Sequence, residues 1–132
     1  MEFRLELIPI PVSDVGRAKR FYAEKCGFLV DLDHQISDSQ RIIQLTPPGS
    51  GCSIMLGSGT DRPPGSVQCL QLVVDDIDAA RDDLVGRGVE IRPVRHFEDG
   101  EFKDGHGGRW NSFAFFDDHD GNGWALQERP SE

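Results

Sequence analysis

The sequence contains an internal repeat, which restricts the chain to a fold built from two similar halves. Val12-Ser13-Asp14-Val15 in the first half matches Val74-Asp75-Asp76-Ile77 in the second, and Ala18 falls at the same offset as Ala80. In both places a strand-like apolar run ends at residues that can cap a helix, Ser13 or Asp14 in the first half and Asp75 or Asp76 in the second. Neither half buries enough apolar surface alone, so we expect the halves to pair, within one chain or between two.

Each half has the order strand–helix–strand–strand–strand. We predict a first module over residues 1–57, a linker over 58–66 and a second module over 67–132. The linker prediction follows from a run of Gly, Pro, Ser and Asp that has no hydrophobic periodicity.

In the first module, Pro9 and Pro11 lack a backbone N–H, so a strand over 5–12 must be an edge strand or pair on one side only. Apolar residues at helical spacing predict a helix over 15–25, which Gly27 ends. The other strands are expected at 28–36, 41–46 and 52–56.

In the second module we expect a helix that Asp75 or Asp76 caps and that runs through Arg87. The strands are expected at 67–74, 90–94, 110–116 and 123–128. Residues 96–109 are polar and glycine-rich, which indicates a long loop. Its alternatives are a lid, a segment exchanged in a dimer, or a disordered surface loop.

The last two strands are expected to form a β-hairpin, because Gly121, Asn122 and Gly123 tolerate the positive φ of a tight turn. Strand alternation then places Trp124 and Glu128 on one face, together with Leu126. A carboxylate on an apolar face needs a partner, which can be a metal, a ligand or a salt bridge.

The composition narrows the classes of partner. A net charge of −9 argues against nucleic acid and anionic membranes, which both attract basic surfaces. No apolar run reaches the length that spans a bilayer, and the N-terminus lacks a signal-peptide pattern. The three cysteines are scattered and odd in number, so we expect reduced thiols and a cytoplasmic protein.

The duplicated βαβββ plan resembles the vicinal oxygen chelate superfamily, which holds glyoxalase I, bleomycin-resistance proteins and extradiol dioxygenases. The resemblance rests on Val-Ser-Asp, Arg-Ala-Lys-Arg-Phe-Tyr and Cys-Gly-Phe early in the chain and on Asp-Gly-Asn-Gly-Trp and Leu-Gln-Glu late. It implies an α+β fold in which tandem modules form a cupped mixed β-sheet with the helices outside. Function varies widely within this superfamily.

The resemblance also implies four metal-ligand positions on inward-facing strands. Carried onto this chain, they fall at about Leu7, within Cys52 to Leu56, at about Cys69 and at Glu128. Leucine cannot ligate, and the second stretch contains no His, Glu or Asp. A divalent ion needs about three to six ligands, mostly nitrogen or oxygen for the harder ions. We therefore expect no metal site of the family type and no cofactor.

Other motifs carry weaker signals. Asp118, Asp120 and Asn122 match the opening of a calcium loop, but the twelfth position is Arg129 and strands flank the segment, so a turn is favoured. The four histidines are unevenly spaced, which favours solvated side chains over a metal site. Cys69 has no sequence-visible base, which favours an inert thiol over a nucleophile.

Two functions remain open. The first is metal-independent binding of a small ligand, aromatic or cationic, in an apolar cup of a homodimer. The residues expected at that cup are Glu128, Trp110, Phe113, Trp124, Cys69 and Leu7. The second is a metal-dependent lyase, isomerase or dioxygenase of glyoxalase type, in which Glu128 is a metal ligand or a general base.

Overall fold

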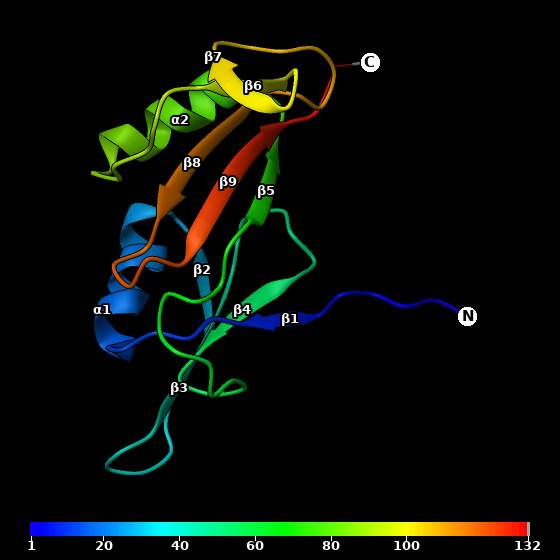
Figure 1. The fold of residues 1–132 in the computed structure, drawn as a ribbon. Coiled ribbons are helices and arrows are strands. Elements are labelled where there is room, and N and C mark those ends of the chain that lie inside the picture. The colour runs from blue at the N-terminus through cyan, green and yellow to red at the C-terminus, as the bar shows by residue number, and fades with distance from the viewer. Residues whose placement is uncertain (132) are drawn as a thin grey trace. The chain divides into compact units, whose positions relative to one another are not determined.

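The computed structural model describes residues 1–131 and divides them into two compact units (Figure 1). The first unit consists of Met1–Val67 together with His119–Asn122. The second consists of Gln68–Asp118 together with residues 123–131. Each unit has one mixed sheet and one α-helix, so the predicted α+β class is confirmed, with sheets of four and five strands.

The first unit has the strand order β1-β4-β3-β2. Its elements are β1 Leu7–Pro9, α1 Val15–Arg20, β2 Leu29–Gln35, β3 Arg41–Thr46 and β4 Ser53–Leu56. β1 runs parallel to β4, and the other pairs are antiparallel. β1 pairs with β4 alone, as the prolines of this segment require. This strand is shorter than predicted.

The first helix departs from its expected form. Helical structure covers residues 15–25, but after α1 the chain widens into a π-helical turn, Phe21–Lys25. The N–H of Cys26 therefore bonds the carbonyl of Phe21, five residues back, at 3.0 Å. The wider turn accompanies the burial of both Phe21 and Tyr22.

The core of the first unit lies between α1 and one face of the sheet. Ile43 and Leu45 of β3 pair with Leu56 and Ile54 of β4, and all four side chains are buried. Alternation places Gln44 and Met55 on the opposite face, where they are half-buried.

The segment His119–Asn122 packs within the first unit although it lies between β8 and β9 in the sequence. Asn122 is fully buried; its amide nitrogen donates to the carbonyl of Pro11 at 2.8 Å, and its oxygen accepts from the N–H of Val67 at 3.2 Å. The carboxylate of Asp120 accepts from both the backbone N–H and the hydroxyl of Ser13. Only Gly121 in this turn has a positive φ, whereas Asn122 and Gly123 were also expected to.

The second unit has the strand order β5-β9-β8-β6-β7. Its elements are β5 Leu70–Val74, α2 Ile77–Gly86, β6 Arg95–Glu98, β7 Glu101–Asp104, β8 Phe113–Asp117 and β9 Gly123–Glu128. β5 runs parallel to β9 as β1 does to β4, so the two units share a plan to which the second adds β7. No helix within residues 1–131 has the length and hydropathy that a membrane span requires.

The two helix starts show the repeat at atomic detail. Asp14 has φ −135° and ψ 105°, and its carboxylate accepts from the N–H of Arg17 at 3.0 Å. Asp76 has φ −137° and ψ 102°, and its carboxylate accepts from the N–H of Ala79 at 3.0 Å. The N-caps predicted from the repeated motif are therefore confirmed, with Asp14 rather than Ser13 as the first cap and Asp76 rather than Asp75 as the second.

The prediction for residues 90–109 was wrong in two respects. No strand forms over 90–94: the carbonyls of Ile91 and Arg92 bond the guanidinium of Arg81, and the N–H of Arg92 bonds the carbonyl of Phe115. The expected polar loop instead contains the β6–β7 hairpin. Asp99 and Gly100 have φ values of 53° and 81°, which suit a two-residue turn with both central residues left-handed.

Candidate functional site

The expected site residues belong to both units: Leu7 lies in β1 of the first, and the other five lie in the second. Leu7 is half-buried.

Glu128 lies at the end of β9, on the face that carries the buried side chains of Trp124 and Leu126. Its Oε2 atom accepts a hydrogen bond from the backbone N–H of Ile77, the first residue of α2, at 2.9 Å. A carboxylate in this position satisfies an unpaired helix N–H and interacts favourably with the helix dipole. The partner of Glu128 is therefore a helix N-terminus.

Trp124 is buried in the core of the second unit. Its side chain is 4% exposed and its ring stacks on Phe116, with the ring centres 6.2 Å apart. Trp124 therefore has a packing role, contrary to its expected place in a ligand cup.

Cys69 lies just before β5 and is exposed, whereas an inward-facing strand position was expected. Its φ of 66° is left-handed, which is uncommon for a residue with a side chain. The alternation of inward-facing and outward-facing side chains in β5 therefore does not extend back to Cys69.

The donor set does not fit a divalent metal. Leu7 offers no donor atom, and the carboxylate of Glu128 already accepts from α2. Within residues 1–131, no group of three or more His, Cys, Asp or Glu side chains is placed to hold an ion. A divalent ion needs about three to six such ligands. No chemical step through a metal follows from these residues.

Four phenylalanines form a continuous apolar surface on the second sheet, which we call the aromatic face: Phe97, Phe102, Phe113 and Phe115. Phe97 and Phe102 are paired across β6 and β7, with ring centres 5.3 Å apart. Phe102 lies 5.2 Å from Phe115 and 5.9 Å from Phe113 in edge-to-face geometry. Since the alternate residues of β8, Ala114 and Phe116, are the buried ones, the aromatic face is the side of the sheet opposite the core.

The aromatic face is accessible to solvent. Phe97 is 50% exposed and Phe102 is 40% exposed, while Phe113 and Phe115 are half-buried. Val73 of β5, whose register partner is Gln127, is 57% exposed. Exposed apolar side chains that gather in one patch are typical of a binding surface.

Gln127 connects the aromatic face to Trp110. It pairs with Phe113 across β8 and β9, and its side-chain nitrogen donates to the carbonyl of Trp110 at 2.8 Å. Trp110 has φ 61°, a left-handed conformation that costs about 1–3 kcal/mol for a residue with a side chain. Its side chain is 49% exposed. Strain of this kind in an exposed aromatic residue marks Trp110 as a candidate contact for a ligand.

A cleft of about 620 Å³ lies at the C-terminal end of the second unit, and we call it the terminal cleft. Trp110 and Arg109 contribute to it from the loop before β8, and Asp75 contributes from the segment that enters α2. Arg129 follows β9 and bonds Asp75 through Nε. The complete lining is Asp75, Arg109, Trp110, Arg129, Pro130 and Ser131.

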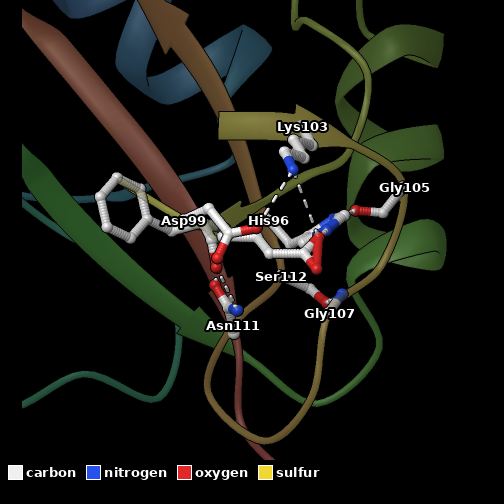
Figure 2. A network of polar contacts seen from close by, with 9 residues as sticks. His96, Asp99, Lys103, Gly105, Gly107, Asn111 and Ser112 are labelled. Atoms are coloured by element: carbon white, nitrogen blue, oxygen red, sulfur yellow. Dashed lines mark hydrogen bonds and ion pairs between the residues drawn. The ribbon is translucent and has the colours of Figure 1, made fainter. Parts of the chain in front are cut away.

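The loop between β7 and β8 is fixed by polar contacts, which Figure 2 shows around His96. His96 Nδ1 lies 2.9 Å from the carbonyl of Gly105 and Nε2 lies 3.1 Å from Glu98. Both partners are acceptors, so both bonds form together only when the imidazole is protonated. The carbonyl of Gly105 and then the carboxylate of Glu98 raise the pKa of His96.

Two further contacts hold the same loop. The side chain of Asn111 bonds both the N–H and the carbonyl of Phe97, at 2.8 and 2.9 Å (Figure 2). His106 Nε2 lies 2.9 Å from the carboxylate of Asp78 in α2. The expectation of a disordered surface loop does not fit these contacts.

Sequence reasoning missed Phe97, Phe102 and Gln127. The signal for the two phenylalanines was Asp99-Gly100 between them, because Asp-Gly is among the strongest short hairpin signals. Phe113, which was expected to line the apolar cup, lies half-buried on the aromatic face. Gln127 carried no signal beyond alternation with Glu128.

Comparisons with known proteins agree with the fold. Residues 4–126 match the Glyoxalase/Bleomycin resistance protein/Dioxygenase superfamily. TnmS3, an antibiotic binding protein from Streptomyces sp. CB03234, is 32% identical; the alignment covers 98% of each chain, with a TM-score of 0.77. A glyoxalase/bleomycin resistance protein from the same strain is 33% identical over 94% of this chain and 99% of its own, with a TM-score of 0.73.

Among curated sequences, the uncharacterized protein YetH of Bacillus subtilis (strain 168) is 26% identical over 124 residues, which are 92% of this chain and 94% of YetH. The duplicated modules, their paired N-caps and the match over residues 4–126 lead to one conclusion. The chain belongs to the Glyoxalase/Bleomycin resistance protein/Dioxygenase superfamily.

Proposed function

We propose that the protein binds a small planar molecule on the aromatic face and does so without a divalent metal. The observation that carries this proposal is the gathering of four phenylalanine side chains on the solvent-facing side of β6, β7 and β8. Phe97 and Phe102 keep about half of their surface exposed in the free protein. A planar ligand that covers them removes that surface from water.

The geometry of the rings suits a flat partner. Phe113 and Phe115 are nearly parallel, at 13°, and Phe102 meets both edge-on. Offset-stacked and edge-to-face contacts are the preferred arrangements between aromatic groups. A planar ligand can therefore continue the packing that the four rings already have among themselves.

The relatives support binding of a small molecule. TnmS3 is described as an antibiotic binding protein, and it matches this chain at 32% identity over almost its whole length.

The alternative of a glyoxalase-type enzyme depends on Glu128 as a metal ligand or a general base. The bond from Ile77 commits one oxygen of this carboxylate to α2, and Glu128 belongs to no group of three or more candidate metal ligands in the part of the chain that the structure describes. Neither observation favours the enzyme over the binding protein.

The proposal is tested by titrating the protein with planar aromatic compounds in a calorimeter, beginning with naphthalene-2-carboxamide as a neutral probe. Phe102→Ala should weaken binding about tenfold, since one aromatic contact of roughly 1.5 kcal/mol is lost. Val85→Ala is the matched control, because Val85 is an exposed apolar residue on α2. Equal affinities for both variants and the parent would overturn the assignment to the aromatic face.

We also propose that the protein is a homodimer in the cytoplasm. The need of each half to bury its apolar surface supports pairing, and the three cysteines, which form no disulfide within residues 1–131, suit a reducing compartment. Light scattering coupled to size-exclusion chromatography tests the dimer, which should have twice the 14.7 kDa mass of the chain.

A further inference from the structure

We propose that the charge of His96 controls how tightly the aromatic face binds its ligand, because His96 and Asn111 together hold Phe97 in place. This inference rests on the proposed function, since it concerns the same planar ligand on the same surface. His96 and Asn111 are positioning residues, which act through Phe97 and do not touch the ligand. The affinity for the ligand should therefore fall as the pH rises.

His96 and Phe97 lie on opposite faces of β6. Phe97 pairs with Phe102 across β6 and β7 and belongs to the aromatic face, whereas His96 pairs with Lys103 on the other face. The side chain of His96 is 16% exposed, so little water reaches its ring. An effect of its charge on a ligand at the aromatic face must therefore pass through the backbone of β6 and the loop that follows β7.

The two ring nitrogens of His96 both face acceptors. Nδ1 lies 2.9 Å from the carbonyl oxygen of Gly105 (Figure 2), and Nε2 lies 3.1 Å from a carboxylate oxygen of Glu98. An imidazolium donates to both, whereas a neutral imidazole has one N–H and turns a lone pair towards the other acceptor. Loss of the proton therefore releases either Gly105 or Glu98.

Both of these residues are connected to Phe97. Glu98 follows it directly in β6, and Gly105 begins the segment that leads to Asn111. The side chain of Asn111 bonds the N–H of Phe97 at 2.8 Å and its carbonyl at 2.9 Å, so it pairs with this backbone as a neighbouring strand would. The position of Phe97 therefore depends on where the loop holds Asn111.

The loop from Gly105 to Asn111 is too closely packed to absorb a displacement at one end. A Cβ atom on Gly107 would lie 2.7 Å from Cβ of His96 and 2.3 Å from the carbonyl oxygen of Asn111. The N–H of Gly107 bonds the hydroxyl of Ser112 at 3.1 Å, and Ser112 is buried. Closely packed groups transmit strain to one another, so a release at Gly105 reaches Asn111.

The surroundings of His96 favour its protonated form. The carbonyl of Gly105 and the carboxylate of Glu98 raise its pKa, and Lys103 opposes them. The ordered loop is therefore fully stabilised below the unfolded pKa of about 6.5, and this stabilisation is lost as the pH rises through the folded value. The other ionisable groups of this region lie on the hairpin, on the loop and on α2: Asp99, Glu101, His106 and Asp78.

The order of Phe97 determines the affinity of the aromatic face. A ligand that requires Phe97 in its bound position binds more weakly in proportion to the fraction of molecules that hold it there. Deprotonation of His96 lowers that fraction, because one restraint on the backbone around Phe97 is lost. Protonation thus preorganises the site without adding a contact to the ligand.

The test is the affinity of the intact chain for naphthalene-2-carboxamide, a neutral probe, measured by calorimetry from about pH 5.5 to about pH 9, the range in which histidine titrates. The parent should bind the probe about fivefold more weakly at the upper end. His96→Gln should show one affinity throughout, since a side-chain amide does not titrate. A constant affinity in the parent, or one that rises with pH, would overturn the inference.

Two further variants locate the effect. His106→Gln is the matched control, because His106 lies in the same loop but bonds Asp78 of α2 at 2.9 Å, and it should retain the pH dependence. Asn111→Ala should weaken binding at every pH and remove the pH dependence, because it cuts the link between the loop and Phe97. The full pH dependence in His96→Gln or Asn111→Ala, or its loss in His106→Gln, would overturn the inference.

A nuclear magnetic resonance titration separates this inference from the proposed function. The Cε1–H signal of His96, identified by its absence in His96→Gln, reports the pKa of the ring. The probe should raise this pKa, because coupling between proton and ligand is reciprocal. If the probe binds and Phe102→Ala weakens it while the pKa of His96 stays the same, the aromatic face stands and this inference fails. If the probe binds at no pH, the proposed function fails and this inference with it.

Discussion

The carboxylate of Glu128 accepts a hydrogen bond from the backbone N–H of Ile77 at 2.9 Å and so joins the end of β9 to the start of α2. Asp76, the residue before Ile77, caps the same helix through the N–H of Ala79. Two carboxylates thus satisfy two of the first N–H groups of α2, which leaves fewer of them to solvent.

From this relationship we expect Glu128→Ala to lower the free energy of unfolding by about 1–2 kcal/mol and Glu128→Gln by about half as much, since the amide still accepts a hydrogen bond but lacks the charge. Urea denaturation measures both. Ligand affinity on the aromatic face should not change. Loss of ligand affinity in these variants with unchanged stability would instead assign Glu128 to the ligand-binding site.

Two asparagines, Asn122 and Asn111, each bridge a backbone N–H and a carbonyl. Asn122 should contribute more to the free energy of unfolding than Asn111. We expect Asn122→Ala to cost about 2–4 kcal/mol, because burial leaves the carbonyl of Pro11 and the N–H of Val67 without this partner. Asn111→Ala is the matched comparison, because its bonds to Phe97 are exposed and water can replace them. Thermal unfolding that ranked the two variants in the opposite order would contradict the assignment.

His96 should make the loop between β7 and β8 sensitive to pH. Its folded-state pKa is raised by the carbonyl of Gly105 and the carboxylate of Glu98. Stabilisation from the imidazolium is therefore complete below the unfolded pKa of about 6.5 and is lost as the pH rises through the folded value.

We expect amide hydrogen exchange in residues 105–112, corrected for its intrinsic pH dependence, to speed up through this pH range in the parent. His96→Gln should remove the change, whereas His34→Gln, on β2 of the first unit, should retain it. A pH dependence that persisted in His96→Gln would assign it to another group.

The stabilisation that Asp33 provides should be lost at low pH, whereas that of His96 is lost as the pH rises. Arg41 first and Lys19 second hold its pKa well below the usual value, through bonds of 2.6 to 2.8 Å. Stabilisation by a carboxylate with a lowered pKa is present above the unfolded value of 3.8 and is lost as the pH falls through the folded one. The stability difference between the parent and Asp33→Asn should therefore shrink as urea denaturation is repeated from pH 5 towards pH 2. A constant difference would show that the charge has no part in it.

The elements that sequence reasoning placed correctly are those whose cause is local. Asp14 and Asp76 stand directly before apolar residues at helical spacing, and a capping bond spans only three residues. The β6–β7 hairpin was also local, but a glycine-rich context concealed its Asp99-Gly100 turn.

Whether each expected site residue is buried or exposed depends on tertiary contacts that strand alternation alone does not determine. Alternation correctly grouped Trp124 with Glu128, but it cannot say which face of the sheet a helix covers. At β9 both faces are buried near its start, since Trp124 and Ala125 are 4% and 2% exposed. The packing of α2 therefore determines which face is the core face and which is the aromatic face. The alternation of residues along a strand does not reveal where a helix packs.

The membership of His119–Asn122 in the first unit affects how the protein can be dissected. A fragment that ends after Val67 would contain all the strands of that unit, but Pro11 and Val67 would lose the amide of Asn122. Gene halves divided at the linker should therefore yield an insoluble or partly folded N-terminal product, unless the missing tetrapeptide is supplied in trans by the other half.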